Sequence, residues 1–435
     1  MIRVLILAAG SAGDVYPFIV IGQALRARGH AVTLVASANF QARVEQAGLR
    51  FVSGLSQQDL DASVADPGLW HPVKGFATIW KHMARHLPGA YAQQLALLKA
   101  EQQQGPTVIV ASTLGLTGRL LQETQGVPLA TVHLAPSCFL GAHDASVRRG
   151  LNWPRSLPQP VIRVIMALVE QLMLDPIVRS AINRLRASLG LAPVRRVMSH
   201  WLHSPQRVIC AFPAWFAAPQ PDWPPNTVCT GFVRMPPSGE QQLAPGLQRF
   251  LDAGAAPIVV TPGSAMAHGR HFLSRALDAA GELGLRVVVV TPYREQLPAT
   301  LPVSVLHVPY APFDLLSRQA AAFVHHGGIG TSATVLAAGK PQLVVPFAFD
   351  QPDNAARLRR LGVAATVLPG APPRAWRAAL AGLLADPAVA SACAALAASM
   401  GQAVPAEEQI ADLVTDLVTE LATGMATGAA TAPRR

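Results

Sequence analysis

Two adjacent histidines, a glycine-rich turn and an Asp-Gln pair are the residues of this chain whose types and spacing best suit chemistry. They lie in the stretch FVHHGGIGTSATVLAAGKPQLVVPFAFDQPDNA, residues 323–355. A glycine turn that opens a helix offers backbone N–H groups and partial positive charge to a phosphate or diphosphate. His326 and Thr331 can donate further hydrogen bonds to phosphate oxygens, and Asp350 with Gln351 suits sugar hydroxyls. The stretch predicts a nucleotide-sugar pocket.

Two members of this stretch also have purely structural interpretations. Because side chains alternate along a strand, we expect His325 to face the side opposite His326. Asp350 taken alone is also what a turn needs to cap a following helix over 352–361. Only the combination of the glycine turn, His326 and the Asp350-Gln351 pair favours a binding site.

A second glycine turn, AAGSAGDVYPF (8–18), follows the first predicted strand. Its spacing, Gly10-x-x-Gly13, lacks the G-x-G-x-x-G pattern, and the second strand ends without an acidic residue to hold a ribose, so we do not expect bound NAD. Asp14 stands at the carboxyl edge of the strand, just before a helix. At this point two roles remain open for it, a helix N-cap and a general base.

The elements that must position these residues are short apolar runs alternating with helix-length segments. The runs cover 3–9, 31–37, 107–112, 128–134 and 207–212 in the first half, and 257–262, 285–291, 303–309, 321–326 and 341–347 in the second. β-branched runs with this spacing indicate βαβ units and parallel sheets, whose carboxyl ends bind ligands. The expected fold class is α/β, two Rossmann-like lobes with parallel sheets facing a central cleft.

Composition divides the chain into four parts. The Pro-, Gly- and Gln-rich stretch MPPSGEQQLAPG (235–246) is typical of a linker, so we expect a first lobe over 1–234 and a second over 247–421. We assign acceptor binding to the first lobe and donor binding to the second. The final residues, 422–435, have no hydrophobic periodicity and are expected to be disordered.

Bulk composition indicates a well-packed globular protein. Of 435 residues, 51% are hydrophobic and only 14% are charged. The apolar start MIRVLILAAGSAGD is interpreted as a strand and not as a signal peptide. No apolar run is long enough for a membrane helix, so we expect a soluble, cytoplasmic protein. Four cysteines far apart argue against a zinc or disulfide framework: Cys138, Cys210, Cys229 and Cys393.

The net charge of +10 is concentrated in one segment. Between Arg148 and Arg207 there are ten arginines against only Glu170 and Asp175. Without lysine runs, and with the arginines scattered among apolar residues, the pattern favours amphipathic helices with a basic outer face over a nucleic-acid surface. Contact with anionic lipid at the inner membrane, or with an anionic substrate, is the alternative.

The segment 310–354 resembles the C-terminal donor motif of inverting glycosyltransferases of the GT-B fold, the family that includes plant secondary-product glucosyltransferases. YAPF (310–313) stands near the place of the family's W-A-P-Q. The resemblance implies that His326 contacts the diphosphate, Thr331 a phosphate, and Asp350 with Gln351 the sugar. GSAGDVYPF resembles the bacterial branch with sterol and glycopeptide glycosyltransferases, which implies Asp14 as catalytic base.

Three segments are similar more specifically to the rhamnosyltransferase B chains of rhamnolipid synthesis. These are GSAGDVYPFI, SPQRVICAFPAWFAAPQPDW (204–223) and AAGKPQLVVPFAFDQPDNAARL. The similarity covers nearly the whole chain except roughly its last fifteen residues. The residues that it implies for donor binding are Ser264, Tyr310, Ala311, Phe313, His326, Gly328, Gly330, Thr331, Asp350 and Gln351.

Several positions depart from the plant motif. Gly330 replaces its asparagine, so one phosphate contact must come from the backbone. Thr334 replaces the glutamate that grips both ribose hydroxyls, and a dTDP-sugar, which carries 2′-deoxyribose, needs no such acceptor. Tyr310 replaces the tryptophan that stacks on the base, and Phe313 its glutamine, so stacking survives without one polar contact.

The resemblance implies inverting transfer of L-rhamnose from dTDP-L-rhamnose to a hydroxyl of a hydrophobic lipid such as a 3-(3-hydroxyalkanoyloxy)alkanoate. The alternative is a UDP-glucose-dependent glucosyltransferase acting on a sterol-like acceptor. His326, the helix terminus at 328–331 and Ser264 would stabilise the leaving diphosphate, with no metal or bound cofactor. The only D-x-D, Asp59 with Asp61, follows no predicted strand and is interpreted as a solvated loop.

The acceptor is expected in the first lobe, near Gly13, Trp70 and Trp80. The helices around 70–95 and 160–200 also supply Phe76, Met166, Leu168 and Trp201 to this region. Methionine and aromatic residues at helical spacing more often pack in the core than contact a ligand. Peripheral membrane contact and an acyltransferase partner chain are further options. Two other classes remain: an NAD-dependent nucleotide-sugar epimerase, disfavoured by the second strand, and a non-catalytic helper, disfavoured by the intact donor motif.

Overall fold

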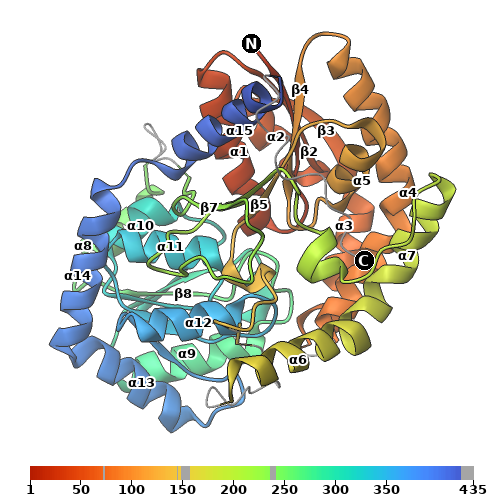
Figure 1. The fold of residues 1–435 in the computed structure, drawn as a ribbon. Coiled ribbons are helices and arrows are strands. Elements are labelled where there is room, and N and C mark those ends of the chain that lie inside the picture. The colour runs from red at the N-terminus through yellow and green to blue at the C-terminus, as the bar shows by residue number, and fades with distance from the viewer. Residues whose placement is uncertain (72–73, 145, 148–156, 236–241, 423–435) are drawn as a thin grey trace.

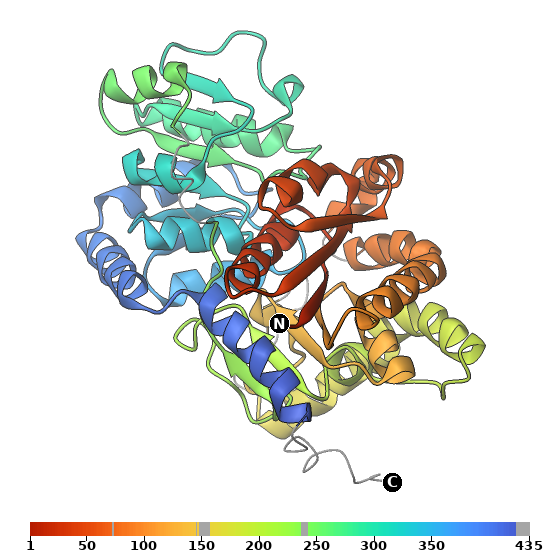
Figure 2. The same ribbon diagram turned by 90° about the horizontal axis from the view of Figure 1, so that it is seen from above.

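The computed structural model describes residues 1–71, 74–144, 146–147, 157–235 and 242–422. They form two α/β lobes, each a parallel sheet with helices packed on it (Figure 1). A view from above shows the two lobes side by side (Figure 2). The prediction of two Rossmann-like lobes with parallel sheets is therefore confirmed.

The first lobe contains a seven-stranded sheet in the order β3-β2-β1-β4-β5-β6-β7. Its strands are β1 (Arg3–Leu7), β2 (Ala31–Ser37), β3 (Arg50–Leu55), β4 (Thr107–Ser112), β5 (Leu129–His133), β6 (Arg207–Cys210) and β7 (Thr227–Cys229). All pairs are parallel, and the central strands are buried on both faces. Continuous apolar runs such as VLIL in β1 suit this position because helices cover both faces of a parallel sheet.

The helices of the first lobe connect these strands. The α-helices are α1 (Ala12–Ala27), α2 (Gln41–Gln46), α3 (Gln57–Ala65), α4 (Gly75–Gln102), α5 (Leu116–Gln125), α6 (Gln159–Val169) and α7 (Asp175–Ser188). Short 3-10 turns are η1 (Ala38–Phe40), η2 (Pro67–Trp70) and η3 (Pro136–Cys138), and π turns are η4 (Glu170–Leu174) and η5 (Val197–Trp201). Helix α4 packs against α5 and α7.

The second lobe contains a six-stranded sheet in the order β10-β9-β8-β11-β12-β13. Its strands are β8 (Ile258–Thr261), β9 (Val287–Val290), β10 (Val305–Val308), β11 (Ala322–His325), β12 (Gln342–Val344) and β13 (Ala364–Thr366). Its helices are α8 (Pro245–Asp252), α9 (Arg270–Glu282), α10 (Phe313–Gln319), α11 (Ile329–Ala337), α12 (Gln351–Arg360), α13 (Pro373–Ala385) and α14 (Pro387–Gln402), with the 3-10 turn η6 (Arg294–Gln296).

The last helix, α15 (Ala406–Ala422), returns to the first lobe and packs on α1, as the dark blue ribbon shows (Figure 2). Its buried residues Ile410, Val414 and Leu417 belong to the core that covers one face of the first sheet. Arg28 at the end of α1 pairs with Glu408 and Asp412, each at 2.9 Å. By packing, this helix belongs to the first lobe, whereas the sequence prediction placed residues up to 421 in the second.

The predicted linker and tail fall largely outside the described residues. Of 235–246, residues 236–241 are not described, and α8 already begins at Pro245. Of the predicted disordered tail, 423–435 are not described, and Ala422 ends α15. Among the described helices no single one is long and apolar enough to cross a membrane, and one bent pair, α13 with α14, passes by length and composition only.

Candidate functional site

The two glycine turns singled out from the sequence meet where the lobes face each other. Asp14 lies in the first turn of α1, directly after β1, and Asp350 precedes α12, after β12. Helix α1 contacts α11 of the other lobe. The Asp14 carboxylate lies near enough to Asp350 to raise its pKa. The structure therefore brings the predicted base and the predicted sugar-binding pair together.

Asp14 is held by the residues of its own turn. Ser11 donates to Asp14 Oδ2 through its backbone N and its Oγ, both at 2.8 Å, which completes a capping box. Gly10 has a φ of 126°, and a Cβ there would come within 2.5 Å of Asp14 Oδ2. Because both bonds reach Oδ2, the other oxygen is the one that can face a substrate. Glycine at position 10 is thus required for this placement.

Burial raises the pKa of Asp14 above its usual range, although the hydrogen bonds from Ser11 act in the opposite direction. The pKa of Asp350 is raised further, to about 7, first by burial and then by the Asp14 charge. A carboxylate with a raised pKa is a better proton acceptor than an ordinary one. Burial therefore raises the pKa of both facing carboxyls, and that of Asp350 reaches about 7.

His326 sits in a cradle made by two glycines. A Cβ on Gly263 would come within 2.8 Å of its Cε1, and a Cβ on Gly328 within 2.5 Å of its Nε2. Its Nδ1 is buried and has no hydrogen-bond partner among the described residues. Burial lowers the pKa of His326 to about 3, so the ring is neutral and carries one N–H. Because buried polar atoms are normally hydrogen-bonded, a buried ring nitrogen without a partner is expected where a ligand supplies the hydrogen bond.

His325 faces the interior, as strand alternation predicts. Its Nε2 lies 2.9 Å from Gln342 Oε1, and Gly327 N donates to its Nδ1 at 3.1 Å. The side chain is fully buried, and burial lowers its pKa to about 4. These bonds fix the turn that starts at Gly327, which has a φ of 91°. His325 thus shapes the glycine turn from beneath.

The N-terminus of α11 opens beside His326, with Gly328 as its N-cap. Ser332 and Thr334 donate their hydroxyls back to the carbonyls of Gly328 and Gly330, each at 3.0 Å. Thr331, which follows Gly330 in the chain, is half-buried in the first turn of α11. Free N–H groups of such a helix end suit an anion.

Asp350 and Gln351 have different surroundings. Gln351 Oε1 accepts from the backbone N of Phe347 at 2.8 Å and of Ala348 at 3.1 Å, so it closes the turn and leaves its NH₂ group for a ligand. Asn354, which the sequence interpretation did not include, donates to Asp350 Oδ2 at 2.7 Å and to Gly327 O at 2.9 Å. Asn354 therefore ties the acidic residue to the glycine turn. Its i, i+4 spacing from Asp350 was the available signal.

The remaining donor candidates differ in exposure. Tyr310 is 57% exposed and close enough to Tyr16 of the other lobe to raise the pKa of that residue. Ser264 is exposed in the loop after β8. Ala311 is buried, and Phe313 packs edge-to-face on Phe323 at 5.7 Å, which directs it into the core. Only the first two present side chains to solvent.

The three acceptor candidates are separated by the fold. Gly13 is exposed in the first turn of α1. Trp70 lies against Phe349 of the second lobe, with ring centroids 5.8 Å apart, and Phe349 has a left-handed φ of 58° next to Asp350. Trp80 is only 7% exposed and packs in the core behind the first sheet, a position for packing and not for acceptor contact. The expectation for Trp80 therefore needs correction.

The D-x-D interpretation also needs correction. Asp59 and Asp61 lie on α3, which follows β3 directly, and not in a loop. Ser56 caps α3 by accepting from Asp59 N and donates its hydroxyl to Asp59 Oδ2 at 2.6 Å, and Asp61 Oδ1 accepts from Gln57 at 2.7 Å. Within the described ranges, no group of three or more His, Cys, Asp or Glu side chains could hold a metal ion.

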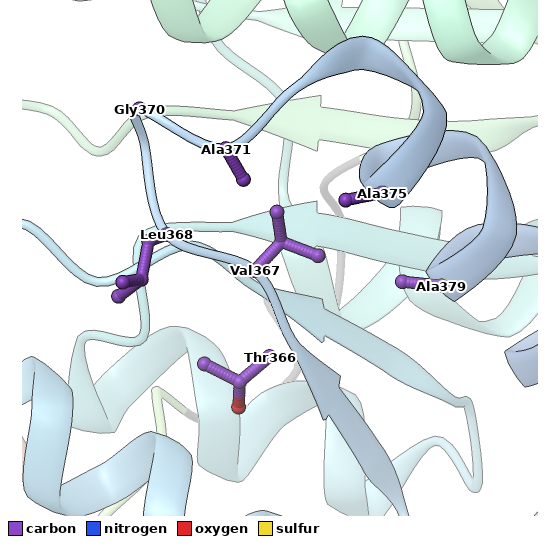
Figure 3. A pocket seen from close by; sticks show the side chains of 7 residues that line it. All are labelled: Thr366, Val367, Leu368, Gly370, Ala371, Ala375 and Ala379. Atoms are coloured by element: carbon purple, nitrogen blue, oxygen red, sulfur yellow. The ribbon is translucent and has the colours of Figure 1, made fainter.

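A separate pocket of about 500 Å³ lies between β13 and α13. Its walls are small or apolar: Thr366, Val367, Leu368, Gly370, Ala371, Ala375 and Ala379 (Figure 3). None of the predicted site residues lines it.

Comparisons with known proteins agree with this two-lobed site. Residues 4–143 match the glycosyltransferase family 28 N-terminal domain, and residues 274–417 match the erythromycin biosynthesis protein CIII-like C-terminal domain. A 6-deoxyallosyltransferase of O-mycaminosyltylonolide from Streptomyces fradiae is 31% identical over 420 residues, 94% of this chain and 95% of the relative. A sterol 3-beta-glucosyltransferase of Arabidopsis thaliana is 27% identical, over 80% of this chain and 57% of the relative.

Solved structures share the fold. The kitacinnamycin glycosyltransferase superposes with a TM-score of 0.70 at 22% identity, covering 96% of this chain and 99% of the other. The spinosyn rhamnosyltransferase in complex with thymidine diphosphate has a TM-score of 0.65 at 20% identity, covering 95% of this chain and all of the other. Together with the relative from Streptomyces fradiae, these findings show that the chain belongs to the family 1-like glycosyltransferases of the GT-B fold.

Proposed function

We propose that this enzyme transfers L-rhamnose from dTDP-L-rhamnose, with inversion, to a hydroxyl of a hydrophobic lipid acceptor such as a 3-(3-hydroxyalkanoyloxy)alkanoate. The observation that carries the donor part is the unpartnered His326 Nδ1 in its glycine cradle beside the N-terminus of α11. There a diphosphate would receive N–H donors from the helix end and from the histidine.

The choice of dTDP rests on what stands at position 334. The Thr334 hydroxyl donates to Gly330 O, so this residue offers no carboxylate to a ribose diol. Two solved relatives, the spinosyn rhamnosyltransferase and a Streptomyces glycosyltransferase, are complexes with thymidine diphosphate. A donor with deoxyribose has no 2′-hydroxyl, so it loses no hydrogen bond in a site without that carboxylate.

The proposed reaction uses residues from both sides of the cleft. The oxygen of the acceptor hydroxyl attacks the anomeric carbon of the sugar while Asp14 accepts the proton of that hydroxyl. The bond between the anomeric carbon and the diphosphate oxygen breaks at the same time. His326, the α11 N-terminus and Ser264 stabilise the charge of the departing dTDP. Asp350 and the NH₂ of Gln351 hold sugar hydroxyls. Gly13 and Trp70 would border the acceptor, and Tyr310 would stack on the base.

A UDP-glucose-dependent transfer to a sterol-like acceptor is the second candidate, because the sterol glucosyltransferase of Arabidopsis thaliana is among the relatives. Thermal stabilisation by a panel of dTDP- and UDP-sugars separates the two candidates, since a ligand that binds only the folded state raises Tm. A shift with UDP-glucose and none with dTDP-rhamnose would favour the alternative. Action in the cytoplasm beside an acyltransferase partner chain stays a prediction, and co-purification tests it.

The first variant to test is His326→Ala. Losing a hydrogen bond to a charged group should weaken dTDP binding by about 1.5–3 kcal/mol. Isothermal titration measures this directly, with the exposed His271 on α9 changed to Ala as the matched control. Unchanged dTDP affinity in His326→Ala would overturn the donor assignment.

A further inference from the structure

Helix α6 and the π turn η4 carry a row of exposed apolar side chains, here called the α6 stripe. It consists of Val161, Val164, Leu168 and Leu172, which are 42%, 59%, 47% and 67% exposed. Spacings of three and four residues place them on one face of a continuous helix from α6 through η4 into α7. Met173, 46% exposed, adjoins this row.

The row is unusual for this molecule. It holds four of the eleven large apolar side chains that are exposed in the described part of the chain, and Met173 is a fifth. The opposite face of α6 is already used, because Ile162 and Met166 pack with Ala142 in a small core. The stripe is therefore not the packing face of the helix, and α6 and α7 lie at the edge of the molecule (Figure 1). Contiguous exposed apolar side chains mark an interaction surface.

Four exposed arginines lie on the same helices as the stripe or in the segment that follows them. Arg163 on α6, Arg184 on α7 and the pair Arg195 and Arg196 are exposed. The π turn η5, which begins after Arg196, contacts η4, so the arginine pair lies near the turn that carries Leu172. We call these four arginines the arginine rim.

The acidic residues of this region are buried and hold the rim in place. Asp175, 2% exposed, accepts from the backbone N of Arg196 at 2.9 Å and of Val197 at 3.1 Å. Glu170, also 2% exposed, accepts from Ser199 N at 2.7 Å and lies 3.7 Å from the Arg196 Nε. Among the described residues 157–200 these are the only two carboxylates. The exposed side chains of this described segment therefore include apolar and positive groups and no carboxylate.

This combination selects among possible occupants. A second copy would bring the same arginines together, and like charges in an interface cost binding free energy. An anionic bilayer fits both features, because its headgroups attract arginine while the acyl boundary accepts leucine and valine. The stripe from Val161 to Leu172 spans about 17 Å, long enough for a helix to lie flat in the interface.

We propose that the α6 stripe and the arginine rim form a docking surface for an anionic lipid bilayer. The proposal concerns a face of the first lobe that contains no residue assigned to donor binding or to catalysis. It does not depend on which sugar or acceptor the enzyme uses.

Co-sedimentation of the full-length chain with large unilamellar vesicles tests the surface without any substrate. Vesicles of phosphatidylcholine alone are compared with vesicles that also contain phosphatidylglycerol. The chain should sediment with the anionic vesicles, and added salt should release it because salt screens the arginines. Leu168→Ser combined with Leu172→Ser should lower the partition constant at least ~10-fold. Arg163→Gln combined with Arg195→Gln should lower it about fivefold per arginine, and this variant leaves Arg196, the partner of buried Glu170, unchanged.

Matched controls change exposed residues of the second lobe. Leu368→Ser with Val404→Ser controls for apolar loss, and Arg318→Gln with Arg374→Gln controls for charge, since all four are exposed. Both control pairs should sediment like the unchanged chain. Failure to sediment with anionic vesicles, or equal loss in the controls, would overturn the proposal. So would a dimer in light scattering that disappears with the stripe variant while vesicle binding is absent.

Discussion

At the scale of single residues, Asp14 does two things at once. Its Oδ2 accepts two hydrogen bonds from Ser11 and so caps α1, while its carboxylate faces Asp350 of the other lobe. Helix capping and proton transfer therefore do not exclude each other here, although sequence reasoning treated them as alternatives. A substitution that keeps the cap and removes the base can separate them.

Asp14→Asn is that substitution, because the amide oxygen of asparagine can accept the same hydrogen bonds from Ser11 that Asp14 Oδ2 accepts. The melting temperature and dTDP affinity should stay close to those of the unchanged enzyme. Turnover should fall at least ~10²-fold, because an amide cannot take the acceptor's proton. Steady-state rates at saturating donor measure this. Near-normal turnover in Asp14→Asn with an intact melting curve would remove Asp14 from the mechanism.

The raised pKa of Asp350 makes stability depend on pH in a defined direction. The carboxyl titrates at about 7 in the folded protein, against 3.8 when unperturbed, so over this interval the folded state retains a proton that the unfolded chain has lost. Its contribution to the free energy of unfolding is therefore fully present below the lower value and declines as pH rises through the interval.

Asp350→Asn removes this titration. The Tm of the variant minus that of the unchanged protein should increase as pH rises from 3.8 to about 7. Scanning calorimetry measures this difference. Asp14→Asn should reduce the same pH effect, because the Asp14 charge is one cause of the raised pKa. A difference in Tm that does not vary with pH would contradict the burial of an acidic Asp350.

At the scale of elements, α15 decides how the end of the chain is used. Its apolar residues enter the core formed by α1 and the first sheet, and Arg28 pairs with two of its acidic residues. The chain thus crosses back from the second lobe and covers the first. Helix α15 therefore stabilises the first lobe, although it follows the second lobe in the sequence.

Ile410→Ala tests this packing. Ile410 is fully buried, and such truncations typically cost about 2–5 kcal/mol because a cavity remains. Chemical denaturation of the full chain measures the loss, with Val404→Ala, 63% exposed, as the matched control just before the helix. A cost below that of the control would mean that α15 detaches readily from the first lobe.

At the scale of the whole molecule, a buried arginine joins the lobes. Arg357 on α12 is 2% exposed and pairs with Asp353 on its own helix at 2.8 Å and with Asp144 of the first lobe at 2.6 Å. Asp353 also accepts from Val147 N of the first lobe at 2.9 Å. This network fixes the distance between the lobes on one side of the cleft.

Arg357→Met should destabilise the protein by about 3 kcal/mol, because it leaves the buried Asp353 without its partner. The control is Arg360→Met, since Arg360 also pairs with Asp144, at 3.0 Å, but is 41% exposed. Its loss should cost less than about 1 kcal/mol. Adding Asp353→Asn to Arg357→Met should recover part of the stability. Equal costs for the two arginines in urea unfolding would contradict an anchoring role for Arg357.

The sequence by itself determined the features that depend on neighbouring residues. Valine-rich runs such as β9 form buried strands, and His325 faces the interior as predicted, because the alternation of side chains along a strand is a local property. The edge strands β3, β7 and β13 were missed, since they are half-exposed and lack a continuous apolar run. Missing β3 also caused the wrong interpretation of Asp59 and Asp61.

Only the tertiary structure decided which of these local pieces meet. It placed Asp14 opposite Asp350, set Trp80 in the core while Trp70 reached Phe349, bound Asn354 to the carbonyl of Gly327, and returned α15 to the first lobe. Each of these outcomes depends on contacts between residues far apart in the chain. Such contacts form because the apolar faces of helices and sheets pack closely against one another and are removed from water. The sequence of one helix or strand does not specify which other element its apolar face packs against.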